Sequence, residues 1–201
     1  MTDTSKREFV LDLLSKSGVM RSRDIASRGV SPGYLKDLAD RGLLSQVSRG
    51  MFSLPSYPQT EHHSLVELSA YSPTCVICLL SALQFHDLTT AMPHVVWAAI
   101  PTGARPPHIT GLGIRIVRMA TEPYRAGVET HLLEGVHVKV YSPAKTVADC
   151  FRFRSYVGME TAVQALKEGL DKRLFSPAEL FEYATVDRVH NFMLPYVEAL
   201  T

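Results

Sequence analysis

Apolar positions at the front of the chain recur with the period of short helices. The first predicted helix carries four apolar residues on one face: Phe9, Val10, Leu13 and Leu14. Gly18 follows as its stop. A second helix of about two turns is expected next, with Ser22 as its N-cap and Gly29 as its C-terminal stop.

A third helix is predicted to begin at Ser31 and Pro32, an N-cap followed by the residue that suits the first helical position. It ends at Gly42 and turns three residues inward: Leu35, Leu38 and Ala39. The segments "LLSQV" and "MFSL" then read as two strands joined at residues 48–50. Three helices and a hairpin in this order predict a winged helix-turn-helix.

The pattern changes after Leu54. The segment "PSYPQTEHHS" is poor in apolar residues and contains two prolines, which is typical of a linker. Helical patterns at 64–73 and 74–88 follow. Four stretches rich in β-branched residues then predict strands at 95–100, 114–119, 128–133 and 136–141. From Ser142 the spacing is helical again, and Ser-Pro pairs at 142–143 and 176–177 mark helix starts.

These elements predict an α+β chain in which an N-terminal winged helix-turn-helix precedes a larger α+β domain with a mixed sheet and C-terminal helices. With 201 residues, the chain is long enough for two compact units. We expect a DNA-binding domain over residues 1–58 and a second domain over residues 59–201.

The distribution of charge along the chain indicates more about its binding partners than the net charge does. The formal net charge of +1 is too small to indicate a nucleic-acid partner. Residues 1–54, however, hold nine Lys and Arg against six Asp and Glu, so a polyanion is expected to meet the front of the chain. No apolar run approaches the roughly 20 residues of a membrane span, and the N-terminus is charged. We expect a cytoplasmic protein with no membrane partner.

The cysteines and histidines give no metal or redox motif. The odd set of cysteines, Cys75, Cys78 and Cys150, predicts no disulfide framework and favours buried helix cysteines. A structural zinc site requires four ligands, and no second pair of cysteines or histidines with matching spacing accompanies the C-x-x-C pair. His131 and His137 are expected on the two arms of one hairpin, without an evident third ligand. We expect no metal and no cofactor.

Polar side chains on the outer faces of the winged helix-turn-helix are the candidates for DNA contact, because a helix fits the major groove and cationic side chains meet phosphates. The candidate DNA-binding residues are Arg21, Arg23, Ser31, Tyr34, Lys36, Arg41 and Arg49. Asp37 and Asp40 lie on the same helix and repel phosphate, so each is useful only opposite a cytosine amino group or as a brace for a neighbouring arginine. Winged helices also serve as protein-interaction modules, and that alternative stays open.

Two regions together resemble the AbiEi family of abortive-infection antitoxins, the regulatory halves of bacterial type IV toxin–antitoxin systems. In front, the resemblance runs from "GVMRSRDIASRG" to the wing "RGMFSLP", with Phe52 as the aromatic of an "RG-aromatic-x-L" pattern. Behind, "LSALQFHDLTTAMPHVVWAAIP" and the more specific "VYSPAKTVADCFRFRSYVGMETAVQALKEGL" carry it. The resemblance implies repression of the protein's own operon at operator DNA with inverted repeats. It also implies that the second domain counteracts a nucleotidyltransferase-like toxin, with or without a stable complex.

Four polar residues of the block at 141–170 allow two interpretations: Lys145, Asp149, Arg152 and Arg154. Lys145 and Asp149 are four residues apart on one helical face and can pair. As structure, the four residues would form a solvated ion-pair network that closes a helix against the sheet. As function, they would form an antitoxin surface that engages a toxin, a nucleotide or RNA.

We expect no enzyme, because neither a nucleophile with a positioned base nor a carboxylate cluster for a metal stands out. Two rival classes remain open. One is an enzyme with a cryptic nucleotidyl- or phosphoryl-processing activity in the C-terminal domain, which would call for a Gly-Ser pair followed by spaced carboxylates. The other is a protein-interaction adaptor.

Overall fold

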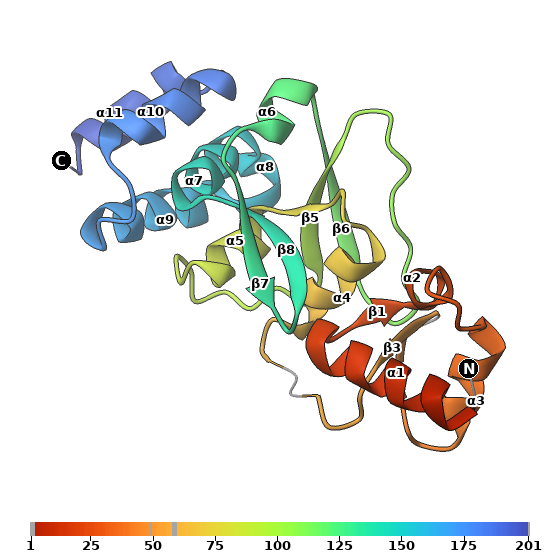
Figure 1. Ribbon diagram of the computed structural model, residues 1–201. Helices are drawn as coiled ribbons and strands as arrows, with labels where there is room; N and C mark the ends of the chain where they lie inside the picture. Colours follow the sequence, from red (N-terminus) through yellow and green to blue (C-terminus); the bar gives the residue numbers. More distant parts are fainter. Residues whose placement is uncertain (1–2, 49, 58–59, 201) are drawn as a thin grey trace. The chain divides into compact units, whose positions relative to one another are not determined.

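The computed structural model describes residues 3–48, 50–57 and 60–200 (Figure 1). The chain divides into two compact units. The first comprises residues 1–74, 107–112 and 131–138, and the second comprises residues 75–106, 113–130 and 139–201. That the segments before and after residue 58 fold independently of each other stays a prediction.

The first unit has the element order of a winged helix-turn-helix, as predicted. Its elements are α1 (Asp3–Ser17), β1 (Met20–Arg21), α2 (Ser22–Ala26), α3 (Pro32–Asp40), β2 (Ser45–Ser48), β3 (Met51–Ser53) and α4 (His63–Tyr71). The three strands form an antiparallel sheet in the order β1-β3-β2. Strand β1 was not predicted, because two residues are too few to show a period of alternation.

The core of the first unit forms where α1, α2 and α3 turn their apolar faces toward β3. It contains Val10, Leu13, Leu14, Ile25, Val30, Leu35, Leu38, Leu44 and Phe52. Phe9 is exposed, so its assignment to the buried face was wrong. Val10 and Leu14 are fully buried at the centre of that face, and Phe9 lies at its edge. The predicted start of α3 is confirmed, since the Ser31 hydroxyl accepts a hydrogen bond from the backbone N–H of Tyr34.

A five-stranded mixed sheet follows, in the order β6-β5-β4-β8-β7. Its strands are β4 (Val76–Ile77), β5 (Val96–Pro101), β6 (Ile114–Met119), β7 (Val128–Leu133) and β8 (Val136–Tyr141). Strand β4 pairs antiparallel with β5 and parallel with β8, and β5 pairs parallel with β6. The segment 74–88 was predicted as helical throughout, which is wrong. The β-branched pair at 76–77 forms β4, and the helix begins only at Leu79.

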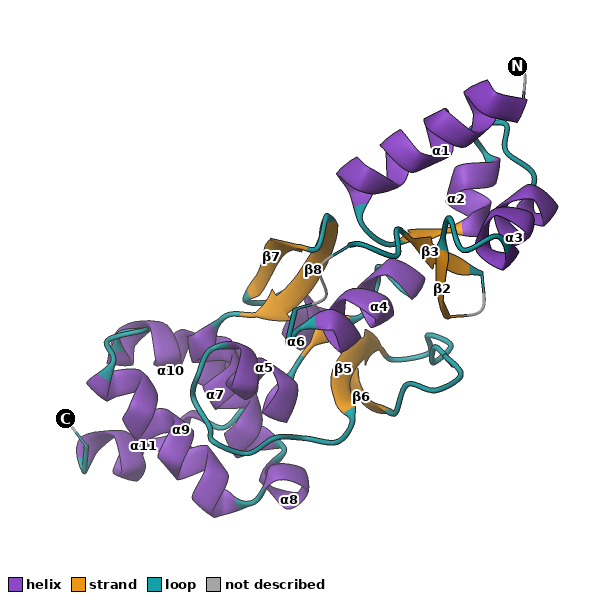
Figure 2. Cartoon of the chain, turned by 90° about the horizontal axis from the view of Figure 1, so that it is seen from below, coloured by secondary structure: helices purple, strands orange, loops and turns teal. Residues whose placement is uncertain are grey.

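Helix α7 is the central helix of the second unit. The helices of this unit are α5 (Leu79–Phe85), α6 (Thr121–Arg125), α7 (Pro143–Arg152), α8 (Arg154–Val157), α9 (Met159–Asp171), α10 (Pro177–Val186) and α11 (His190–Glu198). Helix α7 packs against α5, α9 and α10, and Figure 2 shows the C-terminal helices gathered beside it. Residues 144–151 are therefore all buried.

Two helices of this unit begin with capping serines, and its cysteines are buried. Ser142 and Ser176 cap α7 and α10 by accepting hydrogen bonds from the N–H groups of Lys145 and Glu179, as the two Ser-Pro pairs predicted. All three cysteines are free and buried, but only Cys150 lies in a helix. No helix among the described residues is long and apolar enough to cross a bilayer.

Candidate nucleic-acid interface

The solvent face of α3 carries one available cation and one braced arginine. Lys36 is exposed and makes no ion pair with the described residues. Arg41 forms an ion pair with Asp37, which lies one turn earlier, with Nη2 2.9 Å from Oδ2 and Nε 3.2 Å from Oδ1. Asp37 therefore holds the guanidinium of Arg41 in a fixed orientation, which is the bracing role considered from the sequence, and it offsets the charge of that guanidinium.

Two further candidates on α3 have structural partners. The Ser31 hydroxyl is engaged in the cap of the helix at 3.3 Å from Tyr34 N. Tyr34 is half-buried, and its phenol donates a hydrogen bond to the backbone carbonyl of Asp3 at 3.1 Å. That bond ties α3 to the start of α1. Ser31 remains exposed beside the N-terminus of α3, whose free N–H groups favour a phosphate.

The two arginines at the start of α2 differ in access. Arg23 keeps 69% of its side chain exposed, whereas Arg21 keeps only 15%. Burial lowers the pKa of Arg21, and the charge of Arg23 adds to this effect. Both guanidinium groups lie 3.5 Å from a carboxylate oxygen of Asp24. Arg21 therefore offers much less of its side chain to a ligand than Arg23 does, and its contact with DNA stays a prediction.

The wing is joined to α2 through the backbone. Ser22 was expected to cap α2 with its side chain, but the helix starts without a side-chain cap. The backbone N–H of Ser22 instead donates a hydrogen bond to the carbonyl of Gly50 at 2.8 Å. The wing thus supplies an acceptor for one of the N–H groups at the start of α2 that have no partner within the helix. Gly50 has a φ of +75°, which a glycine adopts at little cost. The candidate Arg49 lies outside the described residues.

Sequence reasoning missed Arg28 as a candidate. This residue lies in the turn between α2 and α3 and is exposed, without an ion pair among the described residues. Its position, a basic residue in the turn of a helix-turn-helix, is the signal in the sequence that could have identified it. With Arg23, Lys36 and the ion-paired Arg41, it gives four exposed cations around α2 and α3 among the described residues.

The polar residues of α7 form a buried network rather than a surface. Lys145 and Asp149 are fully buried, so the expectation of a solvated network or an exposed antitoxin surface at these two positions is wrong. Lys145 Nζ lies 2.5 Å from Asp149 Oδ1 and 3.0 Å from Asp187 Oδ2. Helix α7 packs against α5, α9 and α10, and its positions at Lys145 and Asp149 are closed to water.

The network is closed by a residue that sequence reasoning missed. Asp187 is buried at the C-cap of α10 and binds both Lys145 and Arg152, whose Nη1 lies 3.1 Å from Oδ1. A carboxylate at a helix C-terminus is disfavoured by the helix dipole. An aspartate at that position was therefore the sign in the sequence that a cation lies nearby. Two cations and two carboxylates thus neutralise one another inside the second unit.

Burial dominates the acid–base chemistry of this region. It raises the pKa of Asp149 well above its ordinary range, Lys145 opposes the shift, and the charge of Asp187 adds to it. Burial likewise raises the pKa values of Cys78 and Cys150, which keeps both thiols protonated. We therefore interpret the network of Lys145, Asp149, Arg152 and Asp187 as a structural feature that holds α7 and the end of α10 together. Of the predicted set, Arg152 is half-buried and Arg154 is exposed, with the guanidinium of Arg154 4.2 Å from the centre of the Phe192 ring.

A second polar cluster in the first unit was also missed. Glu134 in the hairpin turn accepts hydrogen bonds from the N–H of Thr60 at 2.7 Å and from its hydroxyl at 2.9 Å, and His63 Nδ1 lies 2.7 Å from its other oxygen. Burial by itself would raise the pKa of Glu134, but these hydrogen bonds outweigh it and lower the pKa. The end of the predicted linker is therefore fastened to the turn at residues 134–135.

The histidines and cysteines leave no metal site among the described residues. No group of three or more His, Cys, Asp or Glu in that part of the chain is arranged to hold an ion. His131 and His137 lie on β7 and β8, the two arms of the predicted hairpin.

One solved structure shares the fold of the whole chain. The crystal structure of the RV2827C protein from Mycobacterium tuberculosis superimposes with a TM-score of 0.57 at 15% sequence identity, over 98% of this chain and 80% of that chain. A search of curated proteins found no match.

The front of the chain matches a known family. The family model described as "Transcriptional regulator, AbiEi antitoxin" covers residues 8–55, from α1 through the wing. This span contains the helix-turn-helix, the wing and the accessible cations around α3. Over residues 8–55, the match confirms the resemblance to AbiEi antitoxins that was predicted from the sequence.

Proposed function

We propose that this protein is an autorepressor that binds operator DNA upstream of its own gene and is the antitoxin of a nucleotidyltransferase-like toxin encoded beside it. The observation that carries the DNA part is the solvent face of α3, a helix of nine residues on which Lys36 is exposed, because a helix fits the major groove. The family match over the same segment supports it. The site of action is the cytoplasm, where operator DNA is found.

In this proposal α3 enters the major groove and the wing follows the neighbouring backbone. Lys36 contacts a base edge or a phosphate, and Arg41 is held by Asp37 in the orientation that a bidentate contact requires. Arg23 and Arg28 contact phosphates at either end of α2. Two copies on an inverted repeat would double these contacts.

The antitoxin activity is assigned to the second unit, which holds the family-like block at 141–170. Lys145 and Asp149 are fully buried, so the antidote does not act through direct contact with either side chain. The neutralising role then belongs to the surface of the second unit, and the network supports that surface from within.

A two-readout experiment in cells tests the proposal. A reporter is placed under the DNA upstream of the gene, and the neighbouring toxin gene is induced in the same strain. The wild-type chain is expected to repress the reporter and to restore growth. Lys36→Ala is expected to relieve repression while growth is still restored. A wild-type chain that neither represses the reporter nor restores growth refutes the proposal, and repression by Lys36→Ala at the wild-type level refutes the role of α3.

A further inference from the structure

The second unit carries a local excess of positive charge that the winged helix-turn-helix does not explain. Residues 88–106 and 113–121 contain no Asp or Glu, and they supply Arg105, Arg115 and Arg118. The second unit as a whole is not basic, so the concentration of arginines in these stretches is a local feature. Like charges without acidic neighbours favour an anionic ligand.

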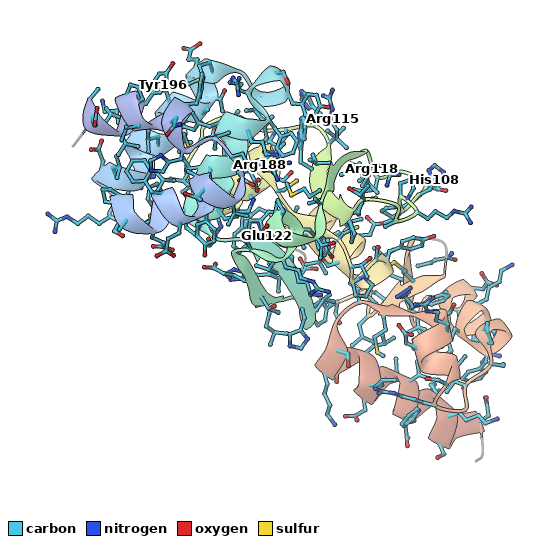
Figure 3. All side chains as sticks on the ribbon, turned by 90° about the horizontal axis from the view of Figure 1, so that it is seen from above. His108, Arg115, Arg118, Glu122, Arg188 and Tyr196 are labelled. Carbon is cyan, nitrogen blue, oxygen red and sulfur yellow. The ribbon has the colours of Figure 1, made fainter. Side chains whose placement is uncertain are left out.

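The arginines project from an edge strand. Strand β6 is at one end of the five-stranded sheet, and both Arg115 and Arg118 extend from it and are exposed (Figure 3). Neither guanidinium is paired with a carboxylate among the described residues. Arg118 Nη1 donates to the carbonyl of Ala104 at 2.7 Å, which fixes the side chain and leaves its other N–H groups available.

Aromatic rings lie directly beside these arginines. The guanidinium of Arg115 is 4.7 Å from the centre of the Trp97 ring and 6.0 Å from that of Tyr156. Tyr156 is stacked on Phe153, with ring centres 6.0 Å apart and an angle of 15° between the planes. The guanidinium of Arg115 therefore lies over two aromatic rings.

A pocket of about 330 Å³ opens between β6 and α8. It is lined by Pro106, Ile116, Val117, Arg118, Phe153 and Tyr156. The walls are apolar and aromatic, and Arg118 is the one charged residue that lines them. Tyr156 is 55% exposed, which is high for an aromatic side chain and leaves part of its ring free to be covered by a ligand.

This combination of groups matches the two halves of an unpaired nucleotide. An aromatic surface stacks a base whatever its identity, and guanidinium groups near that surface bind phosphates of the same strand. Bases of a duplex are already stacked and cannot enter such a pocket. The geometry points to a binding site for a single-stranded nucleic acid on the second unit, with one base against Tyr156 and its phosphates on Arg115 and Arg118. The site is separate from α3 and does not rest on the proposed repression of an operon.

The chain contains its own reporter for this site. Trp97 is the sole tryptophan of the sequence, is only 3% exposed, and lies beneath Arg115 and 6.5 Å from Tyr156. A nucleotide that binds to Arg115 and Tyr156 changes the surroundings of the indole. Tryptophan fluorescence then reports occupancy of this site alone, whereas the anisotropy of a labelled oligonucleotide reports binding anywhere on the chain.

The test titrates the full chain with a labelled oligouridylate of about 12 nucleotides, and with the deoxy oligomer of the same length and base. Wild type is expected to bind with a change in Trp97 fluorescence. Arg115→Gln/Arg118→Gln is expected to weaken binding at least tenfold and to reduce the slope of log affinity against log salt by about 1.4, since each phosphate contact to a single strand contributes about 0.7. Tyr156→Ala is expected to weaken binding at least fivefold, and Tyr156→Phe to bind within twofold of wild type.

Matched controls decide the assignment. Arg173→Gln/Arg188→Gln removes the same charge from two other exposed arginines of the second unit and is expected to change affinity less than twofold. Binding of both oligomers supports a general single-strand site, and binding of the uridylate alone supports an RNA site. The inference is overturned if wild type shows no change in Trp97 fluorescence, if the control pair loses as much affinity, if Lys36→Ala abolishes binding, or if polyglutamate of equal charge binds as tightly and Tyr156→Ala leaves its binding unchanged.

Discussion

Replacing Lys145 by methionine is expected to destabilise the second unit severely. The ammonium group is fully buried and lies within 3.2 Å of three carboxylate oxygens, one on Asp149 and two on Asp187. Methionine has a similar length and no charge, so both carboxylates would stay buried with only the half-exposed Arg152 to compensate them. Removal of one partner from a buried ion pair costs about 3–5 kcal/mol. We expect the free energy of unfolding of the second unit to fall by about that amount at pH 7.5.

The loss should also depend on pH with a definite sign. In Lys145→Met, the pKa of the uncompensated Asp149 rises further above its unfolded value, because desolvation already raises it and Lys145 no longer opposes this. The native variant then binds more protons than the unfolded chain. The destabilisation is therefore absent below the unfolded pKa of aspartate, grows as the pH rises toward the folded pKa, and is complete above it. Its value at pH 5 is expected to be smaller than at pH 7.5.

Urea titration followed by Trp97 fluorescence measures this loss, because the indole belongs to the second unit. Lys172→Met is the matched control. Its side chain is about two-fifths exposed, pairs with Glu168 at 3.5 Å and donates a hydrogen bond to the carbonyl of Asp87 at 2.6 Å, so its loss should cost less than about 2 kcal/mol. The reasoning is refuted if Lys145→Met loses less than about 1 kcal/mol at pH 7.5, or if its deficit grows on acidification.

Three further changes have expected outcomes. Gly127→Ala should destabilise the second unit by about 2–4 kcal/mol in the same urea titration, because Gly127 has a φ of +65° and an added Cβ would lie 2.6 Å from Cβ of Lys145; a loss below about 0.5 kcal/mol would show that the backbone relaxes freely. Ser142→Ala should cost about 1 kcal/mol by removing the cap of α7, and Ser142→Asn should restore most of it; equal stability of all three chains would exclude the cap as a contributor. Glu134 has a lowered folded pKa, so its contribution is present above the ordinary value of 4.5 and is lost as the pH falls through the folded pKa. Thermal melts between pH 3.5 and 7 should show a weaker pH dependence for Glu134→Gln, and identical profiles would contradict the role of its hydrogen bonds.

The sequence predicted the elements that carry local signals. Ser31–Pro32, Ser142–Pro143 and Ser176–Pro177 each start a helix, because an N-cap and a first-turn proline act within one turn of the chain. The strands at 128–133 and 136–141 agree residue for residue with β7 and β8. Between them, Glu134 and Gly135 both have positive φ values, as a tight hairpin turn requires.

What the sequence could not predict depends on contacts between distant segments. The pattern around Lys145 shows an i,i+4 pair, which is usually solvated, and only the packing of α5, α9 and α10 around α7 makes it a buried one. Asp187 is 42 residues away from Lys145 in the chain and joins it only in the folded unit. Strand β4 is two residues long and exists through its neighbours β5 and β8, so no local period indicates it.

The candidate DNA site divides in the same way. The exposure of Lys36 and the capping role of Ser31 follow from the period of the helix and its start. The low exposure of Arg21 appears only in the folded unit, and the bond from Tyr34 to Asp3 joins two helices that are far apart in the sequence. A single sequence does not contain this information, because it arises from tertiary contacts.

Equilibrium binding of the full chain to duplex DNA from immediately upstream of its gene, measured over a range of salt concentrations, tests the central claim most directly. Lys36→Ala is compared with wild type and with Lys167→Ala, which removes an exposed lysine from α9. Lys36→Ala is predicted to bind at least about fivefold more weakly, with a salt slope about 0.9 shallower if Lys36 contacts a phosphate or with altered sequence preference if it contacts a base. Lys167→Ala is predicted to bind like wild type. Wild-type affinity, slope and sequence preference for Lys36→Ala, or an equal loss for Lys167→Ala, would contradict the assignment of α3 as the DNA-binding helix.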